Sequence, residues 1–411
     1  MSKTDSTPEI QCKPEEFRRY LISESEREAA LRVIDKAIEK GSAFDRYGGE
    51  EVDAYEREFA EHTGTKFATA TSSGTAAVHT AISALNLEPG SEVICPPVTD
   101  PGGVGPVLAN LCIPVFADTH PESFNVTAEN IEKVITERTK AIIVAHIAGE
   151  PCDMRAILEV ANRHQLPVIE DVAQAHDATL DGKRLGSFGT IAAFSLMSGK
   201  HHTSGGQGGM VTMNDESLYW RAKSFADRGK NYGREDVGGF FGLNYRMTEL
   251  EAAIGRVQLQ RLPGFIARRQ ELAKRLEEGL AGSKLFSLGW IPEGGRSAYW
   301  FLRVRVHLNN TSATKEEIAG KLRERGVLAA PTYTAIIYKQ PWFANKRIFG
   351  DSEIPWSLPQ CKQIPDYTNC CPNAESALAN HLMISFNESI ADNSIDSIIQ
   401  IMSDVEKSVC K

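Results

Sequence analysis

The distribution of apolar and polar positions divides this chain into two regions. Between about residues 50 and 215, short apolar runs alternate with segments whose apolar residues recur at helical spacing. Near-continuous apolar strands between helices are typical of a largely parallel sheet covered on both faces. We therefore predict an α/β fold with a mostly parallel central sheet flanked by helices. Its strands read KFATATSS, SEVICPPV, IPVFADTH, KAIIVAHIAG, LPVIEDVA, GTIAAFSL and GGMVTMND.

The helices predicted in this region have recognisable ends. DAYEREFAEHTG is amphipathic and ends at Gly64, and GTAAVHTAISALNLEPG is an Ala-rich helix that ends at a Pro-Gly pair. TAENIEKVITERT and DMRAILEVANRHQ show the same helical spacing between strands.

The pattern changes near residue 250. TELEAAIGRVQLQRLPGFIARRQELAKRLEEGL predicts one long helix, bent or restarted at Pro263. AYWFLRVRVHL then alternates strictly, with Arg303, Arg305 and His307 on its polar face. This alternation predicts a half-exposed antiparallel strand.

A second, smaller domain of mixed helices and strands follows this change. TKEEIAGKLRERG begins with a capping box from Thr314 to Glu317, which indicates a further helix. We predict an N-terminal segment over residues 1–40, a large domain over 41–265 and a small C-terminal α+β domain over 266–411.

Composition narrows the class of protein. The 411 residues are 42% hydrophobic and 24% charged, as in an ordinary globular protein with more than one core. The net charge of −9 argues against nucleic acid or an anionic membrane as a partner. We expect neither a signal peptide nor a membrane anchor, because we find no apolar run of the required length in the sequence. The eight cysteines form no CxxC pair. We expect reduced thiols and a cytoplasmic protein.

The first candidate site lies where a strand gives way to a helix in TATSSGTAAVHT. Ser72, Ser73, Gly74 and Thr75 form the turn. Free N–H groups at a helix N-terminus, with hydroxyls beside them, can hold a phosphate. Taken alone, the motif fits a plain N-cap better.

The second candidate site is the end of the strand in VIEDVAQAH. Asp171 stands where the apolar run stops, and Gln174 follows three residues later. A buried carboxylate needs a cationic or hydrogen-bonding partner, and a protonated pyridine nitrogen would be one. A cap on the next element explains Asp171 equally well.

The third candidate site is FSLMSGKHHTSGGQGGM. Ser195 lies within the strand and Lys200 follows it. A lysine in a partly desolvated site can lose its proton and form a Schiff base, although a solvated charge is the usual role of a loop lysine. Together the three sites supply a phosphate cradle, an acid for a ring nitrogen and an amine for an aldehyde. This is the order expected for pyridoxal 5′-phosphate (PLP).

Five segments carry a resemblance to a known family: SSGTAA, VIEDVAQAHDA, FSLMSGK, GGQGGMV and NYRMTELEAAIGRVQLQRL. From about residue 40 to the C-terminus the chain resembles the DegT/DnrJ/EryC1/StrS family of PLP-dependent sugar aminotransferases, which have the fold type I architecture. The resemblance implies that Lys200 is the internal-aldimine lysine, that Asp171 pairs with the pyridine nitrogen and that Gln174 contacts the ring hydroxyl. It also implies phosphate ligands at Gly74, Thr75, Ala76 and Ser195.

The same resemblance implies partners and a reaction. Asn244 would reach the phosphate of the neighbouring subunit's cofactor, which predicts a homodimer with shared active sites. The amino group would come from glutamate or glutamine, pass through pyridoxamine 5′-phosphate and reach a ketosugar or cyclitol, activated by a nucleotide or phosphate.

The chain departs from the family pattern at three places. Asp100, in CPPVTDPGG, occupies the cofactor-site position where an aromatic residue usually stacks on the cofactor ring. Gln207 gives GQGG in place of GEGG. One extra residue also separates the lysine from the glycines, so that counting forward gives Lys200 as the reactive residue and counting backward gives His201.

That spacing leaves other functions open. A histidine at the reactive position is found in a branch of sugar 3-dehydratases, and a regulatory homologue without catalysis is a third reading. We predict Lys200, because the strand fixes the geometry up to Ser195 and Gly205 and Gly206 can absorb a bulge.

Other polar positions carry weaker indications. We predict no metal site, because His201 and His202 would point apart and no third ligand has suitable spacing. His146 reads as a strand-end residue, with contact to a substrate as the alternative. Residues 46–49 and 228–235 are loops that could bind sugar hydroxyls or a diphosphate, or simply be solvated. The apolar stripe of the long helix, at Leu250, Ile254, Val257 and Leu262, predicts helix packing or a dimer seam.

Overall fold

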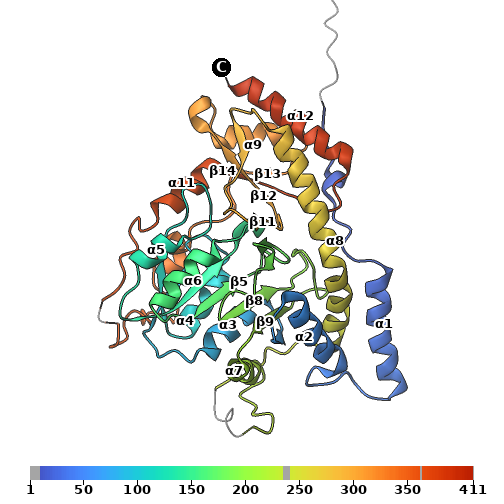
Figure 1. Ribbon diagram of the computed structural model, residues 1–411, viewed down its shortest axis with the longest axis vertical. Coiled ribbons are helices and arrows are strands. Elements are labelled where there is room, and N and C mark those ends of the chain that lie inside the picture. Colours follow the sequence, from blue (N-terminus) through green and yellow to red (C-terminus); the bar gives the residue numbers. More distant parts are fainter. Residues whose placement is uncertain (1–9, 235–240, 362, 411) are drawn as a thin grey trace, which may run out of the picture.

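A seven-stranded sheet forms the centre of the larger lobe (Figure 1). The structure is a computed structural model in which residues 10–234, 241–361 and 363–410 are described. Strand β9 pairs antiparallel with β1 and β8, and all other neighbours in this sheet are parallel. The predicted, mostly parallel sheet is therefore confirmed. Its order is β1 (Phe67–Thr71), β9 (Gly209–Met213), β8 (Ile191–Ser195), β5 (Val168–Asp171), β4 (Thr139–Ala145), β2 (Glu92–Cys95) and β3 (Ile113–Phe116).

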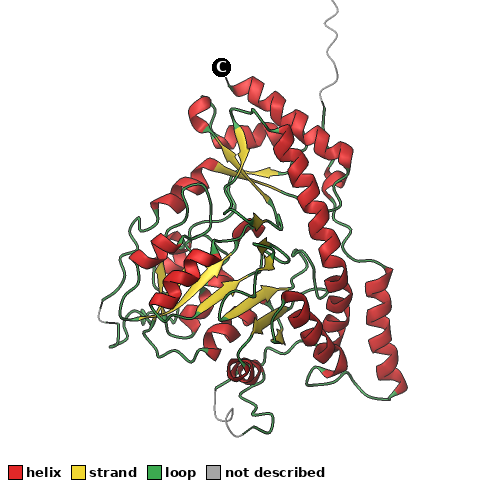
Figure 2. Ribbon diagram, in the orientation of Figure 1, coloured by secondary structure: helices red, strands yellow, loops and turns green. Residues whose placement is uncertain are grey.

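Helices cover both faces of this sheet, as Figure 2 shows. Ile143 and Ala145 of β4 pack into one core, whereas Ile142 and Val144 pack into the other, so the strand is buried on both sides. The first core is closed by α3 (Gly74–Ala84), α4 (Gly105–Ala109) and α7 (Glu216–Ala226). The second is closed by α2 (Gly49–Thr63), α5 (Ala128–Lys133), α6 (Met154–Arg163) and the first half of α8 (Glu249–Gly279).

A four-stranded antiparallel sheet forms the smaller lobe, at the top of Figure 1. Leu302 and Val304 face a core that is closed by α9, α12 and the second half of α8. The order is β10 (Phe286–Leu288), β12 (Leu302–Val306), β14 (His381–Ile384) and β13 (Ala329–Ala330), with α9 (Lys315–Glu324) and α12 (Asp392–Val409) packed on it. The capping box predicted at Thr314 and Glu317 begins α9.

Short elements complete the fold. A three-stranded ribbon has the order β11 (Gly295–Arg296), β6 (Thr179–Leu180) and β7 (Lys183–Arg184). The remaining α-helices are α1 (Glu24–Glu39), α10 (Pro341–Ala344) and α11 (Pro372–Asn380). The 3-10 turns are η1 (Pro14–Phe17), η2 (Pro101–Gly103), η3 (Ile147–Gly149), η4 (Leu308–Asn310) and η5 (Ile337–Lys339).

Helix α8 belongs to both lobes. It runs unbroken through Pro263 for 31 residues, so it is not restarted at the proline. Its first half packs on the large sheet and its second half on the small one. The predicted domain boundary at residue 265 falls inside this helix and stays a prediction.

The expectation of a half-exposed polar face on β12 is wrong at its first residue. Arg303 is buried, with only 2% of its surface exposed. Strand β12 lies between β10 and β14, and its polar face turns toward the large lobe, where Arg303 bonds to Glu150 at 2.6 Å and to His381 at 2.7 Å. Arg305 and His307, toward the strand end, are half-buried.

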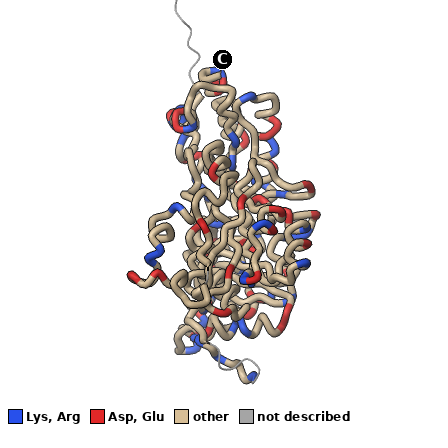
Figure 3. Tube along the Cα trace, turned by 90° about the vertical axis from the view of Figure 1, so that its left-hand side faces the viewer, with Lys and Arg blue, Asp and Glu red and all other residues tan. Residues whose placement is uncertain are grey.

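Basic and acidic positions are interspersed over the trace in Figure 3. Among the residues that the structure describes, no helix is both long enough and apolar enough to cross a bilayer.

Candidate active site

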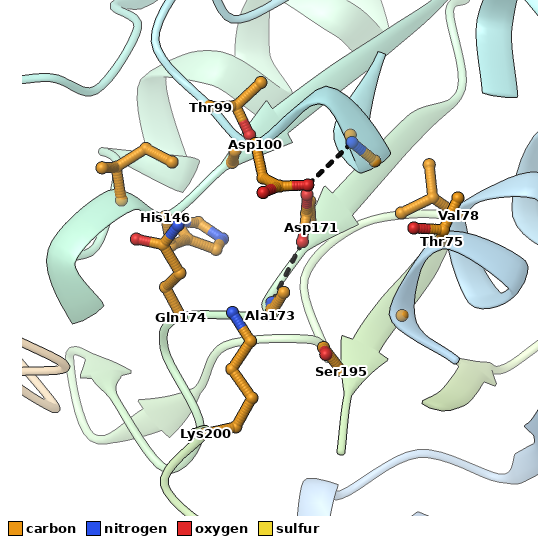
Figure 4. Close-up of a pocket in the computed structure, with 15 residues that line it drawn as sticks. Thr75, Val78, Thr99, Asp100, His146, Asp171, Ala173, Gln174, Ser195 and Lys200 are labelled. Atoms are coloured by element: carbon orange, nitrogen blue, oxygen red, sulfur yellow. Dashed lines mark hydrogen bonds between the residues drawn. The ribbon is translucent and has the colours of Figure 1, made fainter. Parts of the chain in front are cut away.

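A pocket opens at the carboxyl ends of the parallel strands, where ligands of open α/β sheets bind. The loops after β1, β2, β4, β5 and β8 line it (Figure 4). It brings together most of the predicted site residues, namely Gly74, Thr75, Asp100, Asp171, Gln174, Ser195 and Lys200. Ala76, His201 and Asn244 do not line it.

The N-terminus of α3 forms one wall of the pocket. Ser73 is the N-cap, and its Oγ accepts a hydrogen bond from the Ala76 N–H at 3.1 Å. The predicted N-cap is thus confirmed, and the Ser73 hydroxyl already accepts the hydrogen bond of the Ala76 N–H. A Cβ added at Gly74 would lie 2.5 Å from the Cβ of Ser195, so only glycine lets α3 approach β8 this closely. The helix end and the Ser195 hydroxyl therefore fit a phosphate.

Asp171 ends β5 and lies buried in the pocket, with 8% of its surface exposed. Its Oδ1 accepts a hydrogen bond from the Ala173 N–H at 3.0 Å. No ion pair is formed by Asp171 with any described cation, and burial raises the pKa of this carboxyl above its usual range. A carboxylate in this state is suited to a cationic partner such as a protonated ring nitrogen.

Lys200 points into the same pocket from the loop after β8 (Figure 4). Its backbone N–H donates to the Met197 carbonyl at 2.9 Å, which forms a tight turn. Its Nζ lies 4.0 Å from the ring centroid of Trp300. Burial lowers the pKa of this amine, while the nearby carboxylates of Asp171 and Asp100 oppose that shift. A lowered pKa makes the neutral, nucleophilic amine more accessible.

His201 is turned away from the pocket. It is fully buried, and its Nε2–H donates to the Ala298 carbonyl at 3.0 Å. The pairing of β8 with β9 continues to Ser195 and Gly209, and the extra residue lies in the loop between them, where Gly205 adopts φ +100°. Within the described chain, no three His, Cys, Asp or Glu side chains are placed to hold a metal ion.

Asp100 and Gln174 have protein partners of their own. Asp100 Oδ1 accepts a hydrogen bond from the Gly102 N–H at 2.8 Å, which caps η2. Gln174 Oε1 accepts from the Ala148 N–H at 2.9 Å, and its amide donates to the hydroxyl of Tyr333.

Several residues of the site escaped the sequence analysis. Tyr333 and Trp300 reach it from the segment beyond residue 280, and Glu170 lies beneath it. His146, which the sequence placed at a strand end, lines the pocket. Glu170 accepts backbone hydrogen bonds at 2.6–2.8 Å from the loop after β7, and His146 lies 3.3 Å from it. The period-2 alternation of β5 predicts that neighbouring carboxylates point to opposite faces, a signal that could have separated Glu170 from Asp171.

Asn244 lies outside the pocket; it is exposed and forms an isolated β-bridge with the buried Asp227. The two polar loops that the sequence singled out come together near it. Arg246 donates to the Arg46 carbonyl at 2.6 Å, and Lys230 Nζ lies 3.8 Å from the ring centroid of Tyr47. Position 235, at the end of the second loop, lies outside the described residues.

The apolar stripe of α8 packs inside the chain. Leu250 and Val257 contact Ala29 and Val33 of α1. The packing interpretation is confirmed for this part of the stripe.

Comparison with known proteins gives consistent matches. A sequence model of the DegT/DnrJ/EryC1/StrS aminotransferase family matches residues 24–403. GDP-perosamine synthase of Caulobacter vibrioides is 37% identical over 290 residues, covering 70% of this chain and 77% of that protein. An aminotransferase of Psychrobacter cryohalolentis, solved by X-ray crystallography, has a TM-score of 0.85 and 30% identity, covering 95% of this chain and 99% of its own.

One structural match is a protein named as a sugar dehydratase. The GDP-4-keto-6-deoxy-D-mannose-3-dehydratase of E. coli has a TM-score of 0.80 at 23% identity, covering 96% of this chain and 100% of its own. At this identity the match concerns the fold alone.

Proposed function

Because this chain belongs to the DegT/DnrJ/EryC1/StrS aminotransferase family, we propose that it transfers an amino group to a ketosugar or cyclitol in a PLP-dependent reaction. The observation that carries the proposal is the pocket in which Lys200, Asp171 and the α3 N-terminus converge. The donor is glutamate or glutamine, and the acceptor carries a nucleotide or phosphate. The name of the relative GDP-perosamine synthase supports a nucleotide-linked sugar.

The residues of the pocket fit the cofactor part by part. The α3 N-terminus and Ser195 would hold the phosphate, Asp171 would hold the ring-nitrogen proton, and Gln174 would contact the ring hydroxyl. Lys200 would supply the amine for the aldehyde and would move the substrate proton. When bound, PLP withdraws electrons from the reacting carbon.

Lys200 is the residue to test first. Borohydride reduction of the cofactor-loaded protein, followed by peptide mass spectrometry, should place the adduct on Lys200. Lys200→Ala should abolish turnover, and His201→Asn should retain it if the protein still folds.

The alternatives give different results in this experiment. A sugar 3-dehydratase acting through His201 would bind cofactor without labelling and lose turnover in His201→Asn. A regulatory homologue without catalysis would bind no cofactor and remain colourless. The buried position of His201, outside the pocket lining, favours Lys200.

We further propose a homodimer with shared active sites. Leu31, Ile34 and Ile38 form an exposed apolar stripe on α1, although the opposite face of that helix already packs on α8. Asn244 is exposed and outside its own pocket, as a residue that serves a partner's site would be. Mixing Asn244→Asp and Lys200→Ala protomers should restore activity in hybrid dimers. Full activity in a monomer would contradict this.

A cytoplasmic location completes the proposal. All eight cysteines are free thiols, as expected in a reducing compartment.

A further inference from the structure

Arg19 lies in the N-terminal segment yet reaches the backbone of the proposed reactive lysine. Its guanidinium donates one hydrogen bond to the carbonyl of Lys200 and another to that of His201. Its Nε pairs with Glu388 at 2.6 Å, and 15% of its side chain is exposed. A planar fork of this kind fixes two successive carbonyls better than a point charge does.

Residues 10–21, here called the strap, are held along their length by the small lobe. Cys12 N–H donates to the Arg325 carbonyl at 2.9 Å, and the Asn387 amide donates to the Phe17 carbonyl at 2.8 Å. Cys12 and Phe17 are buried in the small-lobe core. The strap runs beside α12 and α8 before α1 begins (Figure 1). Arg19 is therefore presented from a fixed backbone.

Glu388 joins Arg19 to a second buried guanidinium. Arg269, on α8, binds the same carboxylate at 2.8 Å and donates to the carbonyl of Tyr299 at 2.7 Å. Only 2% of the Arg269 side chain is exposed. The two cations hold the pKa of Glu388 below its usual range, so the carboxylate stays charged between them.

The same network fixes the ring beneath the lysine. Arg269 also approaches the Trp300 carbonyl at 3.3 Å. The Trp300 indole N–H donates to the Gly199 carbonyl at 2.9 Å, and its ring faces Lys200 Nζ. Lys200 is thus held at its backbone by Arg19 and flanked at its amine by Trp300.

We propose that Arg19 is a positioning residue for Lys200, and that the strap is a working part of the active site. Without Arg19, the carbonyls of Lys200 and His201 lose the two hydrogen bonds that its guanidinium donates, and the amine becomes more hydrated. This inference rests on the reactive role proposed above for Lys200. It concerns how that amine is held, whatever the substrate.

The test measures the amine itself. In cofactor-free protein, acylation of Lys200 is followed against pH by peptide mass spectrometry. In Arg19→Ala we expect the midpoint to rise by about one pH unit or more toward the ordinary lysine value of about 10.4. The control is Arg18→Ala, which removes the neighbouring, exposed arginine and should leave the midpoint unchanged.

Kinetics of the loaded enzyme give a second readout. Arg19→Ala should lower kcat by roughly tenfold or more and change KM for the amino donor by less than about threefold, because it disturbs the reactive amine's alignment. An unchanged labelling midpoint in folded Arg19→Ala, with only a lower Tm, would show that Arg19 is merely structural and would overturn the proposal.

A second variant, Arg19→Lys, tests the proposal if Arg19→Ala does not fold. Arg19→Lys keeps the charge but loses the fork, and its labelling midpoint should fall between those of wild type and free lysine. A wild-type midpoint in Arg19→Lys, when Arg19→Ala does not fold, would also overturn the proposal. If wild-type Lys200 gives no borohydride adduct, the proposed function fails independently of the strap.

Discussion

The buried carboxylate of Asp171 is unfavourable to the cofactor-free protein, and in the proposed reaction it would hold the ring-nitrogen proton. Asp171→Asn should keep the fold and reduce turnover about 100-fold or more, because a neutral amide cannot hold the ring-nitrogen proton. The cofactor-free variant should be as stable as the wild type or more stable, since a desolvated carboxylate is removed. Steady-state kinetics and thermal unfolding check both parts. Near-normal turnover would mean that Asp171 only caps Ala173.

Asp100 adds a second negative charge to the pocket. It raises the pKa of both Asp171 and Lys200. In Asp100→Asn the Lys200 labelling midpoint should therefore move down, opposite in sign to Arg19→Ala. The same pH series of acylation reactions measures it, and an upward shift would contradict the electrostatic role.

Residues at strand ends could be predicted from the sequence, whereas residues brought in from elsewhere could not. Gly74, Asp171 and Lys200 each follow an apolar run, and the carboxyl ends of parallel strands meet at one edge. Arg19 and Trp300 have no such local signal. They meet the site only through contacts between distant segments.

At the scale of elements, the close contact of α3 with β8 leaves no room for a side chain at Gly74. Gly74→Ala should destabilise the protein by about 1–3 kcal/mol and weaken cofactor binding, because its Cβ collides with Ser195. Denaturant unfolding and cofactor titration measure these effects. The control Gly264→Ala, inside α8 with open space around it, should be neutral or stabilising by up to about 1 kcal/mol. Equal behaviour of the two variants would contradict the steric argument.

Strands that are buried on both faces could be predicted from their apolar runs. The burial of a polar face could not be predicted, because it depends on where the strand lies in its sheet. The apolar runs of β4 and β5 are typical of strands buried on both faces. Arg303 was misplaced because alternation tells which residues share a face, not what covers that face. Pro263 did not end α8, because packing on two lobes outweighs the roughly 3 kcal/mol that an interior proline costs.

At the scale of the molecule, buried histidines should make stability sensitive to acid. Burial lowers the pKa of His176 and His381 to about 3, and those of His201 and His202 lie well below the ordinary 6.5. Between the pKa values of the folded and unfolded states, the unfolded chain binds more protons than the folded one. The stability that comes from the neutral histidines is therefore fully present above pH 6.5, and the free energy of unfolding decreases as the pH falls toward 3. Each group contributes about 1.4 kcal/mol per pH unit.

Denaturant unfolding at pH 7 and pH 5 tests this dependence. The free energy of unfolding should be several kcal/mol lower at pH 5. Equal stabilities at the two pH values would refute the assignment.

The exposed stripe on α1 gives the prediction for the assembly. Ile38→Glu should shift the protein toward monomer in sedimentation and lower activity, because a charge is placed in the proposed interface. Phe349→Glu, at another exposed apolar position, is the control. An Ile38→Glu dimer of normal strength would place the interface elsewhere.

The division into lobes was harder to foresee than the elements. The segment around Ile336, Phe343 and Trp356 follows the small-lobe strand β13 but packs into a core of the large sheet. Hydrophobic periodicity marks helices and strands and does not indicate which core receives them.

The strap also sets an order of events during synthesis. Arg19 leaves the ribosome early, but its partner Glu388 is made 369 residues later. While the intervening residues are made, this guanidinium has no Glu388 carboxylate to pair with, and the large sheet must assemble without that ion pair. The backbone of Lys200 can therefore be held by the complete Arg19–Glu388 pair only after residue 388 has been made.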